Sequence, residues 1–190
     1  MDRPEKVLRA LERMGEKQFV PSIGPVKGRV LEKVIKDHRV KKLLEIGTLY
    51  GYSAILAARN LPAEGKVISL EIDPETAKHA WKNIESSGLE DKIEVIVGDA
   101  KETLPEIHDK LDLLFIDAKK EEYLRYLKLA EKNLKKGSVV VADNVGIFKE
   151  EMKDYLDYVR GSKRYTSETV KIPLEFTKDT WDAMEISIQN

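Results

Sequence analysis

The spacing of hydrophobic residues along the chain predicts two helices before residue 40. From about residue 2 to residue 17, Val7, Leu8, Leu11 and Met14 fall on one helical stripe. Glycine and proline at positions 24, 25 and 28 then interrupt the pattern. A second helix is predicted after them, with the apolar residues between positions 30 and 35 facing inward. Residues 1–38 are therefore expected to form an N-terminal helical cap region.

The rhythm changes from residue 42, where five short apolar runs appear with helical segments between them. The runs cover residues 43–46, 67–72, 93–97, 111–116 and 138–142. They are nearly continuous rather than alternating, which is typical of strands covered on both faces. Strands that alternate with helices predict βαβ units on a parallel sheet.

Capping residues support this alternation. Asp73 followed by Pro74 indicates a helix start, since aspartate caps the first turn and proline needs no N–H there. Gly88 indicates where the same helix ends. A further helix is predicted over about residues 149–160.

Two extended segments at about residues 164–172 and 181–188 end the chain, and we expect them to form an antiparallel pair at the sheet edge. The sequence shows no internal repeat, low-complexity tract or linker that would divide it. We therefore expect one domain spanning residues 1–190.

Composition excludes several classes of protein. The 190 residues include no cysteine, which excludes disulfides, thiolate metal sites and a cysteine nucleophile. With 33 basic and 34 acidic residues the formal charge is -1, which disfavours nucleic-acid binding by bulk electrostatics. No apolar run approaches the ~18 residues of a membrane span, and the N-terminus lacks a signal-peptide core. We therefore expect no membrane anchor and a cytoplasmic location.

The ends of the first two strands combine glycines with an acidic residue. Gly47 and Gly51 allow a tight turn from strand into helix and a close approach to a ligand. Glu71 ends the next strand, where a carboxylate can accept both hydroxyls of a ribose. The spacing G-x-x-x-G lacks the third glycine of a dinucleotide fingerprint, so a nucleoside ligand is favoured. Two loop glycines beside a surface glutamate remain an equally good interpretation of these residues alone.

The ends of two other strands carry oxygen ligands. Asp117 ends the fourth strand, and Asp143 with Asn144 ends the fifth. Two carboxylates and an amide oxygen suit Mg²⁺, whereas the three histidines fall in helices or at helix ends away from these positions, which argues against zinc. A simple turn at Asp143-Asn144 and a helix N-cap at Asp117 are the structural alternatives.

Lys120 follows Asp117 by three residues. It could therefore turn back toward the same site and accept a proton. The alternative is a solvated helix start, because Lys119, Glu121 and Glu122 surround it.

The order of these motifs resembles that of a known enzyme family. The segments LLEIGTLYGYSAILAARNL, VISLEIDPE, VGDA, LLFIDAKKEEY and VVVADNV are similar to the cation-dependent, S-adenosylmethionine (SAM) dependent O-methyltransferases of the catechol O-methyltransferase type. The segments SIGPVKGRVLEKVI, VRGS and LEF extend the similarity to about residues 19–188. The resemblance implies an α/β fold of the Rossmann-like SAM methyltransferase type. Its sheet would be seven-stranded and mostly parallel, with helices on both faces and an antiparallel C-terminal strand.

The resemblance also implies roles for individual residues. The SAM site would comprise Ile23, Glu45, Gly47, Ser53, Glu71, Ile72, Gly98, Asp99, Ala100 and Asp117. Mg²⁺, or another divalent cation, would bind to Asp117, Asp143 and Asn144. Lys120 would be the general base, and Glu175 would hydrogen-bond the second hydroxyl of the substrate. Asp117 would thus belong to the catalytic group as well.

The implied reaction is methyl transfer from SAM to a hydroxyl of a catechol-like small molecule. Two departures from the family bear on this acceptor. Ala118 and Lys119 stand where the catechol enzyme has a His-Trp pair, which removes an aromatic wall over the substrate. Phe19 would replace another aromatic residue at the entrance of the site.

Other functions remain open at this point. The first is a methyltransferase of the same fold that acts on wobble hydroxyuridine in tRNA, which the balanced charge disfavours. The second is an NAD-binding Rossmann oxidoreductase, which would leave Asp143 and Asn144 without a role. A SAM-binding module without catalysis is the third. A homodimer is expected, because family members often pair.

Overall fold

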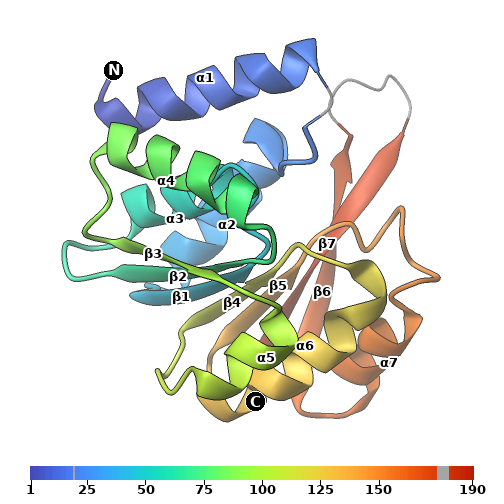
Figure 1. Ribbon diagram of the computed structural model, residues 1–190. Coiled ribbons are helices and arrows are strands. Elements are labelled where there is room, and N and C mark those ends of the chain that lie inside the picture. Colours follow the sequence, from blue (N-terminus) through green and yellow to red (C-terminus); the bar gives the residue numbers. More distant parts are fainter. Residues whose placement is uncertain (19, 175–179) are drawn as a thin grey trace.

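The computed structural model describes residues 1–18, 20–174 and 180–190, and its core is one seven-stranded sheet (Figure 1). The strands lie in the order β3-β2-β1-β4-β5-β7-β6. Their bounds are β1 Lys42–Ile46, β2 Lys66–Glu71, β3 Ile93–Val97, β4 Leu113–Ile116, β5 Val139–Ala142, β6 Tyr165–Pro173 and β7 Trp181–Gln189. Strands β1 to β5 pair in parallel, whereas β7 runs antiparallel to both β5 and β6. The predicted fold class, the five apolar runs and the C-terminal pair are thus confirmed.

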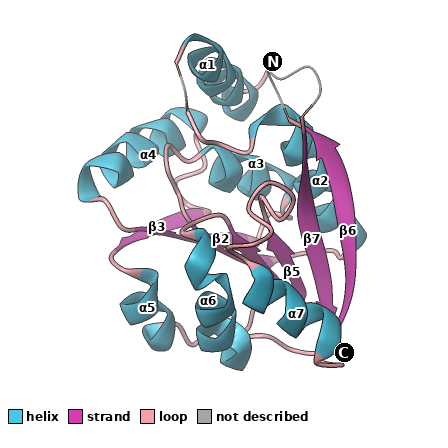
Figure 2. Cartoon of the chain, turned by 90° about the vertical axis from the view of Figure 1, so that its right-hand side faces the viewer, coloured by secondary structure: helices cyan, strands magenta, loops and turns pink. Residues whose placement is uncertain are grey.

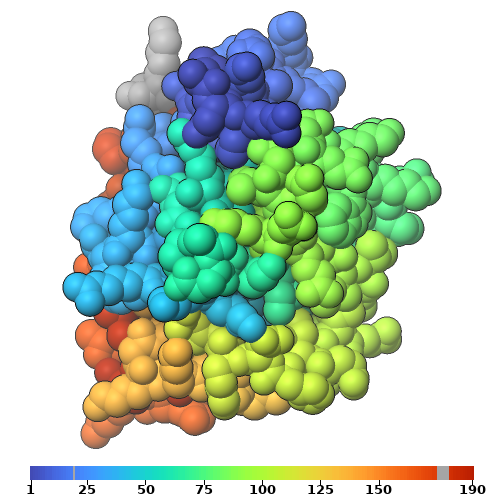
Figure 3. Space-filling view, turned by 90° about the vertical axis from the view of Figure 1, so that its left-hand side faces the viewer, coloured from blue at the N-terminus to red at the C-terminus, as the bar shows by residue number. Residues whose placement is uncertain are grey.

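Helices cover both faces of this sheet (Figures 1 and 2). One face carries α1 Arg3–Lys17, α2 Gly24–Asp37, α3 Tyr52–Asn60 and α4 Pro74–Ser87. The opposite face carries α5 Ala100–Thr103, α6 Tyr123–Ala130 and α7 Lys153–Gly161, with the 3₁₀ turns η1 Leu104–Glu106, η2 Lys120–Glu122 and η3 Glu131–Asn133 beside them. The first helix lies over α3 and α4 (Figure 3). None of the helices in the described part of the chain is both long and apolar enough to cross a bilayer.

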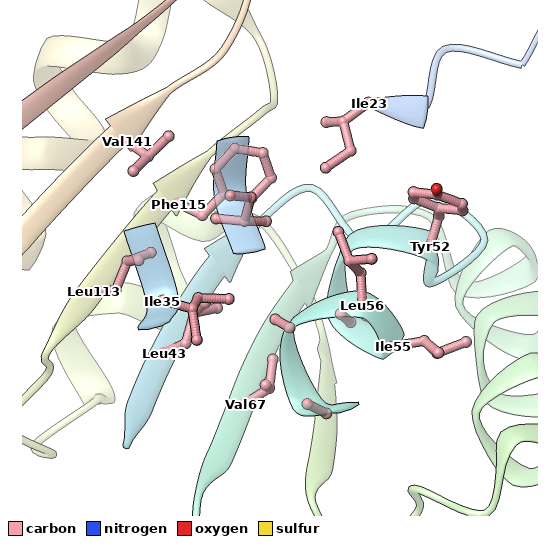
Figure 4. Packing of buried hydrophobic residues seen from close by; sticks show 14 of the residues in the cluster. Ile23, Ile35, Leu43, Tyr52, Ile55, Leu56, Val67, Leu113, Phe115 and Val141 are labelled. Carbon is pink, nitrogen blue, oxygen red and sulfur yellow. The ribbon is translucent and has the colours of Figure 1, made fainter. Parts of the chain in front are cut away.

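Each central strand contributes side chains to two cores. Leu43, Phe115 and Val141 are fully or almost fully buried and point to the α1–α4 face (Figure 4). Their neighbours Leu44 and Ile116 are buried on the α5–α7 face. Because successive side chains of a strand point to opposite faces, double burial requires apolar residues at consecutive positions. This explains the continuous apolar runs of the sequence.

Both ends of α4 lie at the capping residues that the sequence predicts. The side chain of Asp73 accepts a hydrogen bond of 2.6 Å from the backbone N–H of Thr76, and Gly88 has a left-handed φ of 72°. The prediction for α2 was wrong in its start, since the helix begins at Gly24 and contains Gly28. A Cβ at position 28 would lie 3.0 Å from Cδ2 of Leu56, so this glycine allows α2 to pack closely on α3.

The helix predicted over residues 149–160 also starts later, at Lys153. Before it, the chain makes separate turns. The N–H of Phe148 donates to the carbonyl of Asn144 at 3.0 Å, and the N–H of Met152 donates to the carbonyl of Phe148 at 3.1 Å. These turns hold the segment after β5 near the carboxyl ends of the strands.

Candidate active site

A cleft of about 1060 Å³ opens at the carboxyl ends of the parallel strands, on both sides of the β1–β4 junction where the strand order reverses. Open α/β sheets bind ligands at this junction. Pockets for one small molecule usually measure ~300–1,000 Å³, so this cleft can hold a nucleoside-sized ligand beside a second small molecule.

Most residues predicted for the site lie together along this cleft. They are Ile23, Gly47, Ser53, Glu71, Ile72, Gly98, Asp99, Ala100, Asp117, Lys120, Asp143 and Asn144. Glu45 lies on β1 and is completely buried rather than part of the cleft wall. Glu175 and Phe19 lie outside the described residues, so their predicted roles stay predictions.

The turn after β1 requires glycine at position 47. Gly47 has a left-handed φ of 102°, and a Cβ there would lie 2.1 Å from the carbonyl oxygen of Asp117. Its N–H donates to the carbonyl of Leu70 on β2 at 2.9 Å. The ends of β1 and β4 therefore approach more closely than any side chain would allow, which brings Asp117 beside the glycine turn.

Glu71, at the end of β2, is held by two backbone donors. The N–H of Leu49 donates to Oε2 at 2.8 Å, and the N–H of Asp73 donates to Oε1 at 3.0 Å. Each oxygen of a carboxylate has two lone pairs, so each retains one for a further donor. Glu71 lines the cleft and can thus accept two neighbouring hydroxyl groups.

The ends of β2 and β3 form the next stretch of the wall. Ile72 is 68 % exposed and lines the cleft, which leaves an apolar side chain free to cover a flat ligand. Asp99 caps α5 by accepting a 2.9 Å hydrogen bond from the N–H of Lys101, and this bond lowers the pKa of Asp99. Gly98 precedes it with a φ of 155°.

Glu45 is a buried carboxyl group beneath the glycine turn. Burial raises its pKa to about 8, and the negative charges of Asp117 and Glu71 add to the shift. The hydroxyl of Ser69 donates to Oε2 at 2.5 Å, and the hydroxyls of Ser69 and Ser53 partly oppose the shift. The protonated form of this carboxyl group is therefore favoured well above the pH at which a solvated glutamate ionises.

This shift predicts how stability depends on pH. The folded-state pKa of Glu45 lies above its ordinary value of 4.5, so its contribution to stability is complete below pH 4.5 and is lost as pH rises through about 8. Glu45→Gln copies the protonated form and does not titrate. We expect this variant to be more stable than the parent protein above pH 8, by several kcal/mol, and to differ less at pH 5. Urea unfolding of both proteins at the two pH values measures this. A constant difference between them would contradict the assignment.

The β4 and β5 ends carry an acidic pair, and each acid contacts a lysine. Lys120 Nζ lies 3.0 Å from Asp117 Oδ1 and donates to the hydroxyl of Tyr123 at 2.9 Å. Lys27 Nζ, from α2, lies 2.7 Å from Asp143 Oδ1. Both lysines line the cleft. Lys120 thus turns toward Asp117, as its spacing allows.

The electrostatics of this pair favour a bound cation. Burial and the negative charge of Asp117 raise the pKa of Asp143, and Lys27 opposes the shift. Within the described residues, no three acidic, histidine or cysteine side chains form a metal-binding group. The donor set is instead two carboxylates and the amide oxygen of Asn144, all hard oxygen ligands that suit Mg²⁺. No histidine is among the described residues that line the cleft. The residues present therefore fit a hard divalent cation.

Sequence reasoning missed Lys27 and Asp182, which are both buried here and lie 2.6 Å apart between Nζ and Oδ2. A signal existed for Lys27, because it precedes Val30 and Leu31 by three and four residues and so shares their inward helix face. Asp182 lies on β7, among consecutive buried positions of that strand. A charged residue at an inward position suggests a buried partner.

Comparison with known proteins agrees with this architecture. Residues 3–160 match a protein family described as O-methyltransferase. The catechol O-methyltransferase of Mus musculus is 33 % identical over 183 residues, covering 92 % of this chain and 68 % of the relative. Catechol O-methyltransferase B of Danio rerio is 35 % identical over 193 residues, covering 97 % of this chain and 72 % of the relative. The O-methyltransferase of Bacillus cereus, solved in complex with SAH, superposes with a TM-score of 0.85 at 25 % identity, covering 99 % of this chain and 90 % of that one.

The sheet order and the cleft at the strand-order reversal define a Rossmann-like α/β protein with a cleft suited to a nucleoside-type ligand. The chain belongs to the O-methyltransferase family and is a SAM-dependent O-methyltransferase related to catechol O-methyltransferase. The resemblance drawn from its motifs is confirmed.

Proposed function

We propose that this enzyme methylates one of two neighbouring hydroxyl groups on an aromatic small molecule and uses a divalent cation to do so. One observation supports this most strongly. Asp117, Asp143 and Asn144 lie in the same cleft as Glu71 and the Gly47 turn. Oxygen ligands for a cation thus share one cavity with a site suited to a nucleoside.

The contacts described above support a SAM site at one end of the cleft. Glu71 would accept the two ribose hydroxyls with the lone pairs left free by Leu49 and Asp73. Ile72 would cover the adenine ring, and Gly98, Asp99 and Ala100 would line its edge. The methionine end of SAM would reach the backbone near Ile23, Gly47 and Ser53. Glu45 would lie beneath the methionine end of SAM, and Asp117 would belong to both the SAM site and the cation site.

The acceptor end combines the cation ligands with a base. Asp117, Asp143 and Asn144 would hold the cation, and a cation that binds two vicinal oxygens lowers the pKa of one of them. Lys120, acting as a neutral amine, would take the released proton at its Nζ, which lies 3.0 Å from Asp117 Oδ1. Methyl transfer would require the acceptor oxygen, the methyl carbon and the sulfur in line, with the sulfur keeping the electron pair of the broken bond, and holding the reactants in this way would supply much of the rate.

The walls around the acceptor suggest broad selectivity. Ala118 and Lys119 line the cleft in place of an aromatic wall. Phe148 supplies an aromatic surface from another segment, with its ring centre 5.9 Å from Lys120 Nζ and the residue 36 % exposed. Ile147 and Leu174 line the same region. A catechol ring with a substituent would fit here better than a bare catechol alone.

The test is a methyl-transfer screen with labelled SAM over catechol, a caffeoyl ester, phenol and bulk tRNA. We expect the two vicinal diols to react at least ~10-fold faster than phenol, since a second oxygen anchors them to the cation. EDTA treatment should lower the rate at least ~10-fold, and added Mg²⁺ should restore it. Full activity in verified metal-free enzyme would refute the cation. Methylation of tRNA with none of the diols would favour the nucleoside acceptor instead.

A further inference from the structure

Asp182, near the start of β7, lies behind the proposed cation site, and its side chain is completely buried. Its Oδ1 accepts hydrogen bonds of 3.1 Å from the N–H groups of Gly146 and Ile147. Its Oδ2 accepts bonds of 2.6 Å from Lys27 Nζ and 2.8 Å from Asn144 Nδ2. One carboxylate thus binds the loop after β5 at three points and binds α2 at a fourth.

The four hydrogen bonds use the whole acceptor capacity of Asp182, because a carboxylate has about four lone-pair sites. Asp182 therefore has no acceptor left for a substrate or a cation. The loop lies very close to β7, because a Cβ on Gly146 would lie 2.8 Å from the carbonyl carbon of Asp182. Any effect of Asp182 on the cation site must therefore pass through the groups to which it is hydrogen-bonded.

Asn144 is the bound group whose orientation matters. An ionised carboxylate only accepts hydrogen bonds, so Asn144 must turn its Nδ2 toward Asp182. The Oδ1 of Asn144 is then not used in the hydrogen bond to Asp182, and no residue in the described part of the chain donates a hydrogen bond to it. Asn144 also has a left-handed φ of 64°, which the loop contacts stabilise.

We propose that Asp182 is the positioning residue that selects the amide orientation of Asn144, so that oxygen rather than nitrogen is presented to the cation. The inference rests on the cation role proposed above. An amide nitrogen carries two hydrogens and does not ligate Mg²⁺ or Mn²⁺, so a flipped Asn144 removes one ligand of three. Partners behind a metal ligand commonly change metal affinity by ~10–100-fold.

The test uses Mn²⁺ as the probe, with affinity measured by calorimetry on the ligand-free chain. In Asp182→Asn, the side-chain oxygen still accepts from Gly146 and Ile147, whereas the new amide nitrogen donates toward position 144 and no longer accepts from Lys27. Asn144 then flips to accept it. We expect Mn²⁺ to bind at least ~10-fold more weakly, with SAM affinity in the absence of metal changed less than ~3-fold.

The exchanged pair Asn144→Asp/Asp182→Asn separates orientation from charge. It keeps the total charge of the parent, and a carboxylate at position 144 presents oxygen whichever way it rotates. We expect this double variant to bind Mn²⁺ no more than ~3-fold more weakly than the parent does. Glu185→Gln is the matched control, since it removes another buried carboxylate from β7, one that pairs with Arg160 at 2.7 Å, and should leave Mn²⁺ affinity unchanged.

The outcomes are distinguishable. Parent-like Mn²⁺ affinity in Asp182→Asn would overturn the proposal, as would an exchanged pair that binds no better than the single variant. Should Asp182→Asn fail to fold, the exchanged pair decides alone, and its failure to fold or to bind Mn²⁺ would equally overturn the proposal. A parent protein that binds SAM but no Mn²⁺ would instead refute the cation role itself.

Discussion

Replacing Lys120 with methionine is expected to lower kcat by about 10²–10⁴-fold, the usual contribution of a general base. Lys120 Nζ contacts Asp117 Oδ1 and the Tyr123 hydroxyl, so the amine lies at the edge of the proposed cation site. Methionine keeps the length of the side chain but has no basic atom. The KM for the acceptor should change by less than about 3-fold, because the proposed cation ligands remain.

An arginine at the same position separates two roles of the lysine. Lys120→Arg keeps the positive charge beside Asp117, but a guanidinium does not give up its proton in a protein. We expect Lys120→Arg to be as inactive as Lys120→Met. Activity that returns with arginine would show that the charge alone matters. Lys153→Met is the control, because Lys153 is exposed on α7 and pairs with Asp157 away from the cleft. Initial rates across a pH series measure all three variants.

Replacing Gly47 with alanine is expected to cost on the order of 3–5 kcal/mol of unfolding free energy. Two effects add up. The residue has a φ of 102°, which strains any L side chain, and the new Cβ would lie 2.1 Å from the carbonyl oxygen of Asp117. That oxygen belongs to backbone held in place by the bond from Asp117 N–H to the carbonyl of Ile46 at 3.0 Å. The strands must therefore separate.

Thermal unfolding and SAM calorimetry check this expectation. A loss of that size lowers Tm by roughly 10 °C in a chain of this length, and the displaced turn should weaken SAM binding as well. Gly161→Ala is the matched control, because nothing lies within 4 Å of a Cβ there and φ lies outside the left-handed region. We expect it to be neutral. Equal Tm values for the two variants would contradict the steric argument.

The strands could be predicted from the sequence because burial on both faces requires apolar residues at consecutive positions of the strand itself. The run from Leu43 to Ile46 alternates between two cores, so every position that faces a helix layer is apolar except Glu45. Helix ends were predicted where one residue decides them, as at Asp73 and Gly88. The start of α2 was not, because Gly28 looks like a break and its contact with Leu56 lies 28 residues away.

The candidate site was predictable to the extent that strand ends carry it. Parallel strands end at one edge, so Glu71, Asp117 and Asp143 had to come together once the sheet order was known. Lys120 follows Asp117 closely enough for local geometry to bring its amine back. Residue type and spacing therefore made these four residues candidates for one site, and the sheet order placed them in one cleft.

The sequence by itself determined the strands, the parallel sheet and the set of polar residues at its carboxyl edge. Only the tertiary structure decided how those residues are charged and oriented. Lys27 meets Asp182 across 155 positions of the chain, and Asp182 meets Asn144 across 38. Such pairs have no spacing rule, because they arise where folding removes water and buried charges must find partners. The same burial raises the pKa of Glu45 to about 8, a shift that its position in a strand does not reveal.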